Sequence, residues 1–117
     1  MRFMNIDIET YSSNDISKCG AYKYTEAEDF EILIIAYSID GGAISAIDMT
    51  KVDNEPFHAD FETFKIALFD PAVKKYAFNA NFERTCLAKH FNKQMPPEEW
   101  ICTMVNSIAV TGKSLIL

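Results

Sequence analysis

Apolar and polar residues alternate in the first strand that the sequence predicts. Met4, Ile6 and Ile8 are apolar, and the positions between them are polar. A period of two is typical of a β-strand with one buried face, so we predict a strand over residues 3–8. Residues 10–28 are mostly polar, which predicts a loop with a short helical turn near 15–19.

Two further strands are predicted before residue 50. Residues 31–39 are rich in β-branched side chains, which predicts a central strand buried on both faces. The Asp-Gly-Gly sequence at 40–42 is typical of a hairpin turn, and residues 43–49 complete a third strand. We therefore expect the first three strands to form an antiparallel meander.

The second half of the chain has a different periodicity. Apolar residues recur at intervals of three and four over 60–69 and 79–91, which predicts two helices. Short strands are predicted at 73–78 and 100–102, and a third helix at 103–110. The order β-β-β-α-β-α-β-α indicates an α/β fold, with helices packed on a mixed sheet.

Composition and charge restrict the class of protein. A chain of 117 residues is enough for one compact domain, and a formal net charge of −6 argues against gripping nucleic acid by charge alone. Carboxylates gathered around divalent cations would also make a chain acidic. The sequence shows neither a signal peptide nor an apolar run near the roughly 20 residues that span a membrane, so we expect a cytoplasmic protein without membrane partners.

The cysteines do not suggest a disulfide framework or a zinc site. Cys19, Cys86 and Cys102 are odd in number and widely spaced, without a Cys-x-x-Cys pair. Free cysteine is among the most buried residue types. We therefore predict three small buried thiols.

Two acids at the end of the first strand are the first candidate for chemistry. Alternation places Asp7 and Glu9 on the same face, roughly 6.5–7 Å apart along the backbone. Adjacent carboxylates repel each other, and hard cations such as Mg²⁺ favour oxygen ligands of this kind. A solvated strand end with two ordinary acids explains the same pattern, because a bare Asp-x-Glu is common.

A second acid follows a predicted strand-to-helix junction. Asn79 or Asn81 could cap the helix that begins there. Glu83 then falls in its first turn, where the helix dipole favours a negative group. The functional alternative is that Glu83 faces Asp7 and Glu9 as a further metal-site carboxylate.

Each of the other residues near these segments has two possible roles. Phe82 could stack on a base, although its helical position favours core packing. Tyr22 and Tyr24 could contact a nucleic acid strand or cover the sheet edge. For Lys74 and Lys75 we predict a solvated strand entry rather than a phosphate clamp.

Taken together, the acidic segments resemble a known family. Asp-Ile-Glu-Thr at 7–10 and Asn-x-x-Phe-Glu at 79–83 are similar to the first two motifs of the DEDD exonucleases. Residues 6–12, 19–24 and 30–33 resemble the N-terminal region of phage and prophage family A DNA polymerases, as do the segments 77–84 and 100–104. This resemblance implies a ribonuclease H-like fold.

The resemblance also implies an activity, the hydrolysis of the terminal phosphodiester at a single-stranded DNA 3′ end with two Mg²⁺ or Mn²⁺ ions. Asp7 would bridge both ions, Glu9 would hold one of them, and Glu83 would support the second. Thr10 and Tyr11 would line the pocket for the terminal nucleotide. Asn79 would contact substrate or cap the helix, and we favour the cap.

Two departures from the family pattern qualify this expectation. The second motif usually carries Asp, whereas this chain has Glu83. The third motif, a Tyr or His followed by an Asp, has no convincing match in residues 1–117. We therefore expect a partial exonuclease domain, truncated at its C-terminus, whose partner is the remainder of a polymerase chain.

Such a fragment would have little nuclease activity of its own, because it lacks one metal ligand and the residue that orients the attacking water. Its uncovered apolar surface would favour self-association. The alternative from a different class is a non-catalytic module that keeps the ribonuclease H-like shape and serves as a nucleic-acid-binding or scaffold domain.

Overall fold

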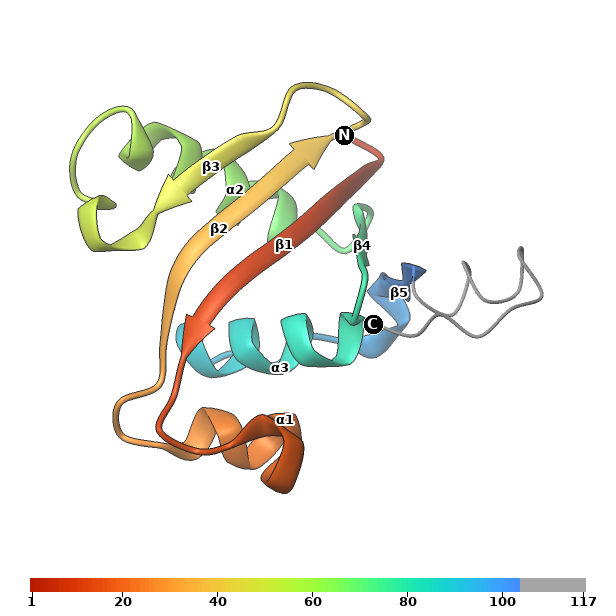
Figure 1. Ribbon diagram of the computed structural model, residues 1–117. Helices are drawn as coiled ribbons and strands as arrows, with labels where there is room; N and C mark the ends of the chain where they lie inside the picture. Colours follow the sequence, from red (N-terminus) through yellow and green to blue (C-terminus); the bar gives the residue numbers. More distant parts are fainter. Residues whose placement is uncertain (104–117) are drawn as a thin grey trace.

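The computed structural model describes residues 1–103. Within this range the chain forms one mixed sheet with helices packed on it (Figure 1). The helix predicted at 103–110 lies almost wholly outside the described residues. The elements are, in order, β1 (Phe3–Tyr11), α1 (Ile16–Glu26), β2 (Glu31–Ile39), β3 (Ser45–Asp48), a 3₁₀ turn (Met49–Lys51), α2 (Phe57–Leu68), β4 (Lys74–Ala77), α3 (Ala80–Phe91), a second 3₁₀ turn (Pro97–Glu99) and β5 (Trp100–Cys102).

The sheet of the described residues has the strand order β3-β2-β1-β4-β5. The pairs β1–β2 and β2–β3 are antiparallel, which confirms the predicted meander. The pairs β1–β4 and β4–β5 are parallel, so the sheet is mixed, as predicted. Strand β1 lies at the centre and therefore carries its acids into the middle of the sheet (Figure 1).

The core lies between the sheet and helices α2 and α3. The alternation predicted for β1 is confirmed, because Met4, Ile6 and Ile8 are all buried. Phe64 of α2 and Leu87 of α3 are fully buried against the same side. Among the described helices, none is long and apolar enough to cross a bilayer.

The prediction that residues 31–39 are buried on both faces is wrong. Ile32, Ile35 and Tyr37 are buried, but Ile34 is 40% exposed. Ile34 pairs with Glu9 of β1, so the two residues share a face of the sheet. That face is open to solvent in the part of the chain that the structure describes, and the β-branched run is therefore buried on one side only.

The prediction of a loop with one short helical turn over residues 10–28 is wrong, because helix α1 occupies much of this segment. The helix extends over Ile16–Glu26. Asp15 caps the helix by accepting a hydrogen bond from the N–H of Ser17. Gly20 interrupts the helix with φ 77° and ψ 170°, a conformation that glycine adopts without steric cost. The interruption divides α1 into two short pieces, neither of which has a clear helical periodicity.

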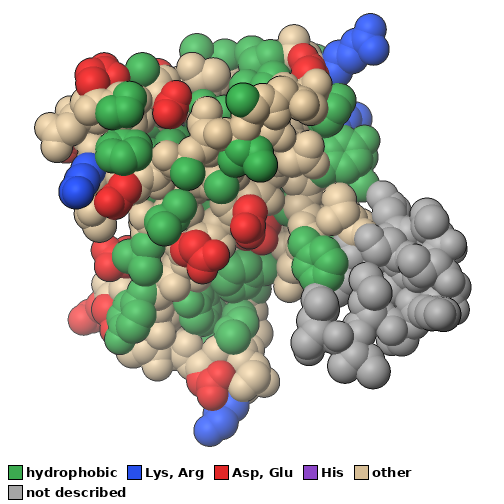
Figure 2. Space-filling view, turned by 45° about the horizontal axis from the view of Figure 1, so that its top comes forward, with side chains coloured by type: hydrophobic (Ala, Val, Ile, Leu, Met, Phe, Trp, Pro, Cys, Tyr) green, Lys and Arg blue, Asp and Glu red, His purple; other side chains and the backbone are tan. Residues whose placement is uncertain are grey.

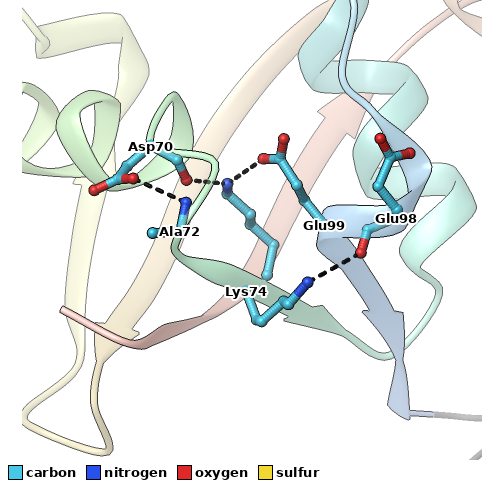
Figure 3. Close-up of polar contacts among 6 residues, drawn as sticks. Asp70, Ala72, Lys74, Glu98 and Glu99 are labelled. Carbon is cyan, nitrogen blue, oxygen red and sulfur yellow. Dashed lines mark hydrogen bonds and ion pairs between the residues drawn. The ribbon is translucent and has the colours of Figure 1, made fainter.

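The two lysines of β4 have different environments. Lys74 is exposed as predicted, and its Nζ donates to the carbonyl of Glu98 (Figure 3). Lys75 is fully buried, so the prediction of a solvated side chain is wrong for this residue. Successive side chains of a strand point to opposite faces, and Lys75 has the inner position. Its Nζ donates to Asp70 O at 2.9 Å and to Glu99 Oε1 at 2.7 Å.

The three cysteines are free thiols. Cys86 is fully buried in the core, as predicted. Cys19 and Cys102 are partly exposed, so the prediction of buried thiols does not hold for them. Cys102 donates a hydrogen bond to the carbonyl of Phe78, which joins β5 to the end of β4.

Candidate functional site

Asp7 and Glu9 lie on the open face of the central strand. Both side chains are exposed, whereas Ile6 before them and Ile8 between them are buried. In the β1–β2 pair, Asp7 lies opposite Ala36 and Glu9 opposite Ile34. The predicted same-face arrangement is therefore confirmed, with small or apolar neighbours that offer these carboxylates no counter-charge.

Glu83 approaches this pair from the first turn of α3. Its side chain is 6% exposed, although it carries a carboxyl group. Burial, followed by the negative charges of Asp7 and then Glu9, raises the pKa of Glu83 to about 8. The structure thus brings the three predicted acids into one electrostatic neighbourhood.

One carboxyl oxygen of Glu83, Oε2, is buried without a hydrogen-bond partner among the described residues. A buried polar atom without a partner costs free energy, and two negative neighbours increase that cost. A proton or a cation at this position would remove it.

The oxygen donors fit a hard divalent cation in kind. Asp7, Glu9 and Glu83 are all carboxylates, the ligands that Mg²⁺ and Mn²⁺ prefer. Within residues 1–103, however, no group of three His, Cys, Asp or Glu side chains lies close enough to hold an ion as the side chains stand. The described residues therefore do not form a closed cation site with the side chains as they stand.

Thr10 and Tyr11 follow the acidic pair and differ in their surroundings. Tyr11 is 53% exposed at the end of β1. Thr10 is half-buried, and its Oγ1 lies 3.0 Å from the hydroxyl of Tyr24. The register of β1 against β2 shifts between Glu9 and Thr10, so the pairing of the two strands is irregular directly after the acids.

Asn79 begins α3 but does not cap it with its side chain. No side-chain capping hydrogen bond is formed, so the favoured interpretation of Asn79 as a cap is wrong. Its φ of −124° and ψ of 77° differ from the extended geometry of a typical cap. The backbone carbonyl of Asn79 instead accepts from the N–H groups of Phe82 and Glu83, and the side chain is exposed.

Tyr24 is a residue of this region whose place the sequence left open. It is buried, and its ring packs against Phe82 at 5.6 Å and against Phe30 at 6.0 Å between centroids. Phe82 is thereby confirmed as a packing residue. The position of Tyr24 depends on α1 being helical through residue 26, and the polar sequence of that segment gave no signal for it.

The surface next to the acids is shallowly hollowed. A cavity of about 200 Å³ adjoins Asp7 and has Ala36 and Ile44 among its walls. Larger grooves lie elsewhere, including one of about 600 Å³ between α1 and α3 that neither Asp7 nor Glu9 lines. Figure 2 shows acidic side chains among apolar ones near the middle of one face, with basic side chains only toward its margins.

Comparison with known proteins gives this geometry a context. No protein-family model matches the sequence. The DNA polymerase of Bacillus phage SP02 is 48% identical to it over 107 residues, which is 92% of this chain. The chain is homologous to a segment of a phage DNA polymerase. It spans only 16% of the length of that polymerase.

Two solved structures share the fold of this chain. A Trypanosoma brucei RNase D, crystallised with RNA U12, superposes with a TM-score of 0.59 at 16% identity, over 93% of this chain and 32% of that one. Brucella melitensis NrnC superposes with a TM-score of 0.59 at 17% identity, over 97% of this chain and 47% of that one. The fold is therefore shared with these two proteins and is ribonuclease H-like, as the motifs implied.

Proposed function

We propose that this chain is part of a DNA polymerase and carries part of the two-metal site of its 3′–5′ proofreading exonuclease. The observation that supports this proposal is the buried, unpartnered Oε2 of Glu83, which faces the charges of Asp7 and Glu9. If Glu83 had a purely structural role, its buried Oε2 would be expected to accept a hydrogen bond from a neighbouring donor. Mg²⁺ or Mn²⁺ is the cofactor that suits three carboxylates.

Each acid has a role in this proposal. When bound, two divalent ions would stabilise the attacking and leaving oxygens of an in-line displacement at a terminal phosphodiester. Asp7, whose charge raises the pKa of Glu83 more than the charge of Glu9 does, would contact both ions. Glu9 would hold one ion from the end of β1, and Glu83 would hold the other from α3.

The substrate would lie on the open face of the sheet. Tyr11 and Asn79 are exposed, and Thr10 directly follows Glu9 in the chain. The hollow beside Asp7, with Ala36 and Ile44 in its walls, has an apolar surface suited to a sugar or a base. We infer that the rest of the polymerase makes most of the electrostatic contacts with the DNA backbone, because this chain has a net charge of −6.

The test is metal binding by the chain itself. Mn²⁺ is titrated into wild-type chain and into the Asp7→Ala variant, with the heat of binding measured by calorimetry and Mn²⁺-induced broadening measured by NMR. We expect broadening centred on Asp7, Glu9 and Glu83, and a loss of affinity in Asp7→Ala. Asp53→Ala removes an exposed acid of a loop and serves as the control, with affinity unchanged.

An identical isotherm for wild type and Asp7→Ala would count against the proposal. The same preparation tests hydrolysis. We expect residues 1–117 to digest a single-stranded primer poorly in Mg²⁺, because no third motif is found in them. Efficient Mg²⁺-dependent digestion by this chain would contradict that expectation while supporting the exonuclease assignment.

A second function is favoured by one observation, that no three acids of residues 1–103 close on a common point. A non-catalytic module with the ribonuclease H-like shape would bind a single strand or pack on the polymerase without needing an ion. It predicts that oligonucleotide affinity is the same with Mn²⁺ and with a chelator. The exonuclease proposal predicts tighter binding when Mn²⁺ is present.

A further inference from the structure

Tyr24 connects the two segments that carry the acids. The end of β1 and the first turn of α3 are separated by some 70 positions in the sequence, and the side chain of Tyr24 contacts both. We propose that Tyr24 is a positioning residue that fixes the spacing of Glu9 and Glu83 for cation binding, an inference that rests on the proposed function. It does not require Tyr24 to touch substrate or ion.

The first contact fixes the end of β1. The Tyr24 hydroxyl lies 3.0 Å from Oγ1 of Thr10, the residue that follows Glu9. The strand pairing breaks at this step, because Glu9 lies opposite Ile34 and Thr10 opposite Ile32, which leaves one extra residue in β2. Pairing of β1 with β2 is therefore irregular directly after Glu9. The hydrogen bond between Thr10 and Tyr24 replaces part of the positional constraint that regular strand pairing would give.

A backbone contact strengthens the same connection. The hydroxyl of Ser12 donates to the carbonyl of Tyr24 at 2.7 Å. Side chain and main chain of one residue thus hold both Thr10 and Ser12, on either side of Tyr11. The segment after the acids cannot shift without breaking two hydrogen bonds.

The second contact fixes the start of α3. The ring of Tyr24 packs on Phe82, the residue before Glu83, at 5.6 Å between centroids and an angle of 54°. Phe30 packs on the ring at 6.0 Å edge-on. Tyr24 is 9% exposed, so its ring has little freedom to move. A rigid ring between Thr10 and Phe82 makes the distance between their neighbours, Glu9 and Glu83, a property of the fold.

Variants can separate the hydroxyl from the ring. Tyr24→Phe keeps the packing on Phe82 and removes only the bond to Thr10, and Thr10→Val removes the same bond from the other side. We expect each to weaken Mn²⁺ binding about fivefold, below the roughly tenfold or greater effect of groups that bond a ligand directly. The double variant is expected to be no weaker than either single one, because both remove one interaction.

The matched control is Tyr22→Phe, two residues away on the same helix, whose side chain is 74% exposed. It is expected to leave the Mn²⁺ affinity and the amide resonances of Thr10 and Glu83 unchanged. Tyr24→Phe is expected to shift both resonances. The free energy of unfolding is measured for every variant, since a purely structural role would lower it without changing the affinity.

The outcomes are distinct. If wild type binds Mn²⁺ and Tyr24→Phe binds equally well, the positioning role is wrong and the proposed function stands. If wild type shows no Mn²⁺ binding near Asp7, the proposed function fails and this inference fails with it. If Tyr24→Phe does not fold, Thr10→Val decides, and wild-type affinity in that variant overturns the inference.

Discussion

The Nζ of Lys75 lies 2.7 Å from Oε1 of Glu99, and the side chain of Lys75 is completely buried. Glu99 precedes β5, whereas Lys75 belongs to β4, so the ion pair joins two segments 24 residues apart. A second bond from the same Nζ to the carbonyl of Asp70 ties in the loop after α2. This pair holds the outer part of the sheet to the strand that leads into α3 and Glu83.

Breaking the ion pair from one side should be severe. Glu99→Gln leaves the charge of Lys75 buried without a counter-ion, which typically costs about 3 kcal/mol or more. We expect a loss of about 3 kcal/mol in the free energy of unfolding, measured by urea denaturation. Glu98→Gln, an exposed neighbour, is the control and should change stability by less than about 0.5 kcal/mol.

The double variant Lys75→Met with Glu99→Leu tests whether the unpaired buried charge causes the loss of stability. Replacing both charges by apolar side chains of similar volume leaves no unpaired buried charge, so the loss should be clearly smaller than in Glu99→Gln. A double variant less stable than the single one would show that packing, rather than charge burial, explains the effect.

The hairpin turn between β2 and β3 gives a backbone prediction. Asp40 and Gly41, in the connection between Ile39 and Ser45, both have positive φ, 52° and 75°. Gly41→Ala places a Cβ on a left-handed residue and should lower the free energy of unfolding by about 1 kcal/mol. Gly41→Asn should lose less, because asparagine tolerates this region. Equal stability of Gly41→Ala and wild type would contradict the strain argument.

Local sequence patterns correctly predicted the features of the fold that depend on a single segment of the chain. The alternation of Met4, Ile6 and Ile8 gave the strand, its buried face and, through it, the common face of Asp7 and Glu9. Asp-Gly-Gly at 40–42 gave the hairpin, because its residues suit positive φ. These features are local, so a single segment of sequence carries the information.

The errors came from features that depend on distant residues. Ile34 resembles a core residue, but whether its face is covered depends on other elements. Lys75 looks solvated in sequence, and only Glu99, far along the chain, makes its burial tolerable. Tyr24 belongs to a helix that Gly20 interrupts, and its contact with Phe82 is tertiary. The approach of Glu83 to Asp7 was one of two alternatives that the sequence left open, and only the family resemblance favoured it, since no local pattern joins the two residues.

The raised pKa of Glu83 predicts how stability depends on pH. Its pKa is about 8 in the folded chain and near the ordinary glutamate value of 4.5 when the chain is unfolded. Between these values the folded state keeps a proton that the unfolded state has lost, so unfolding releases a proton and stability falls as pH rises. The slope approaches about 1.4 kcal/mol per pH unit within this window and vanishes below and above it.

Glu83→Gln isolates this contribution, because glutamine stays neutral at every pH. We expect the variant to gain stability relative to wild type as pH rises from 5 to 8, measured by urea denaturation at constant ionic strength. Glu28→Gln, which removes an exposed acid, should follow the wild-type curve. Parallel curves for Glu83→Gln and wild type would mean that Glu83 titrates normally.

The same pKa predicts proton release when an ion binds. At pH 7 most Glu83 side chains are protonated, because their pKa is about 8. A carboxylate must lose its proton to ligate a cation, so each Mn²⁺ bound through Glu83 should release close to one proton at pH 7 and almost none at pH 9.5. Calorimetry in buffers of different ionisation enthalpy measures this number directly. Binding heats at pH 7 that do not depend on the buffer would exclude Glu83 as a ligand, while leaving Asp7 and Glu9 to be tested by their own variants.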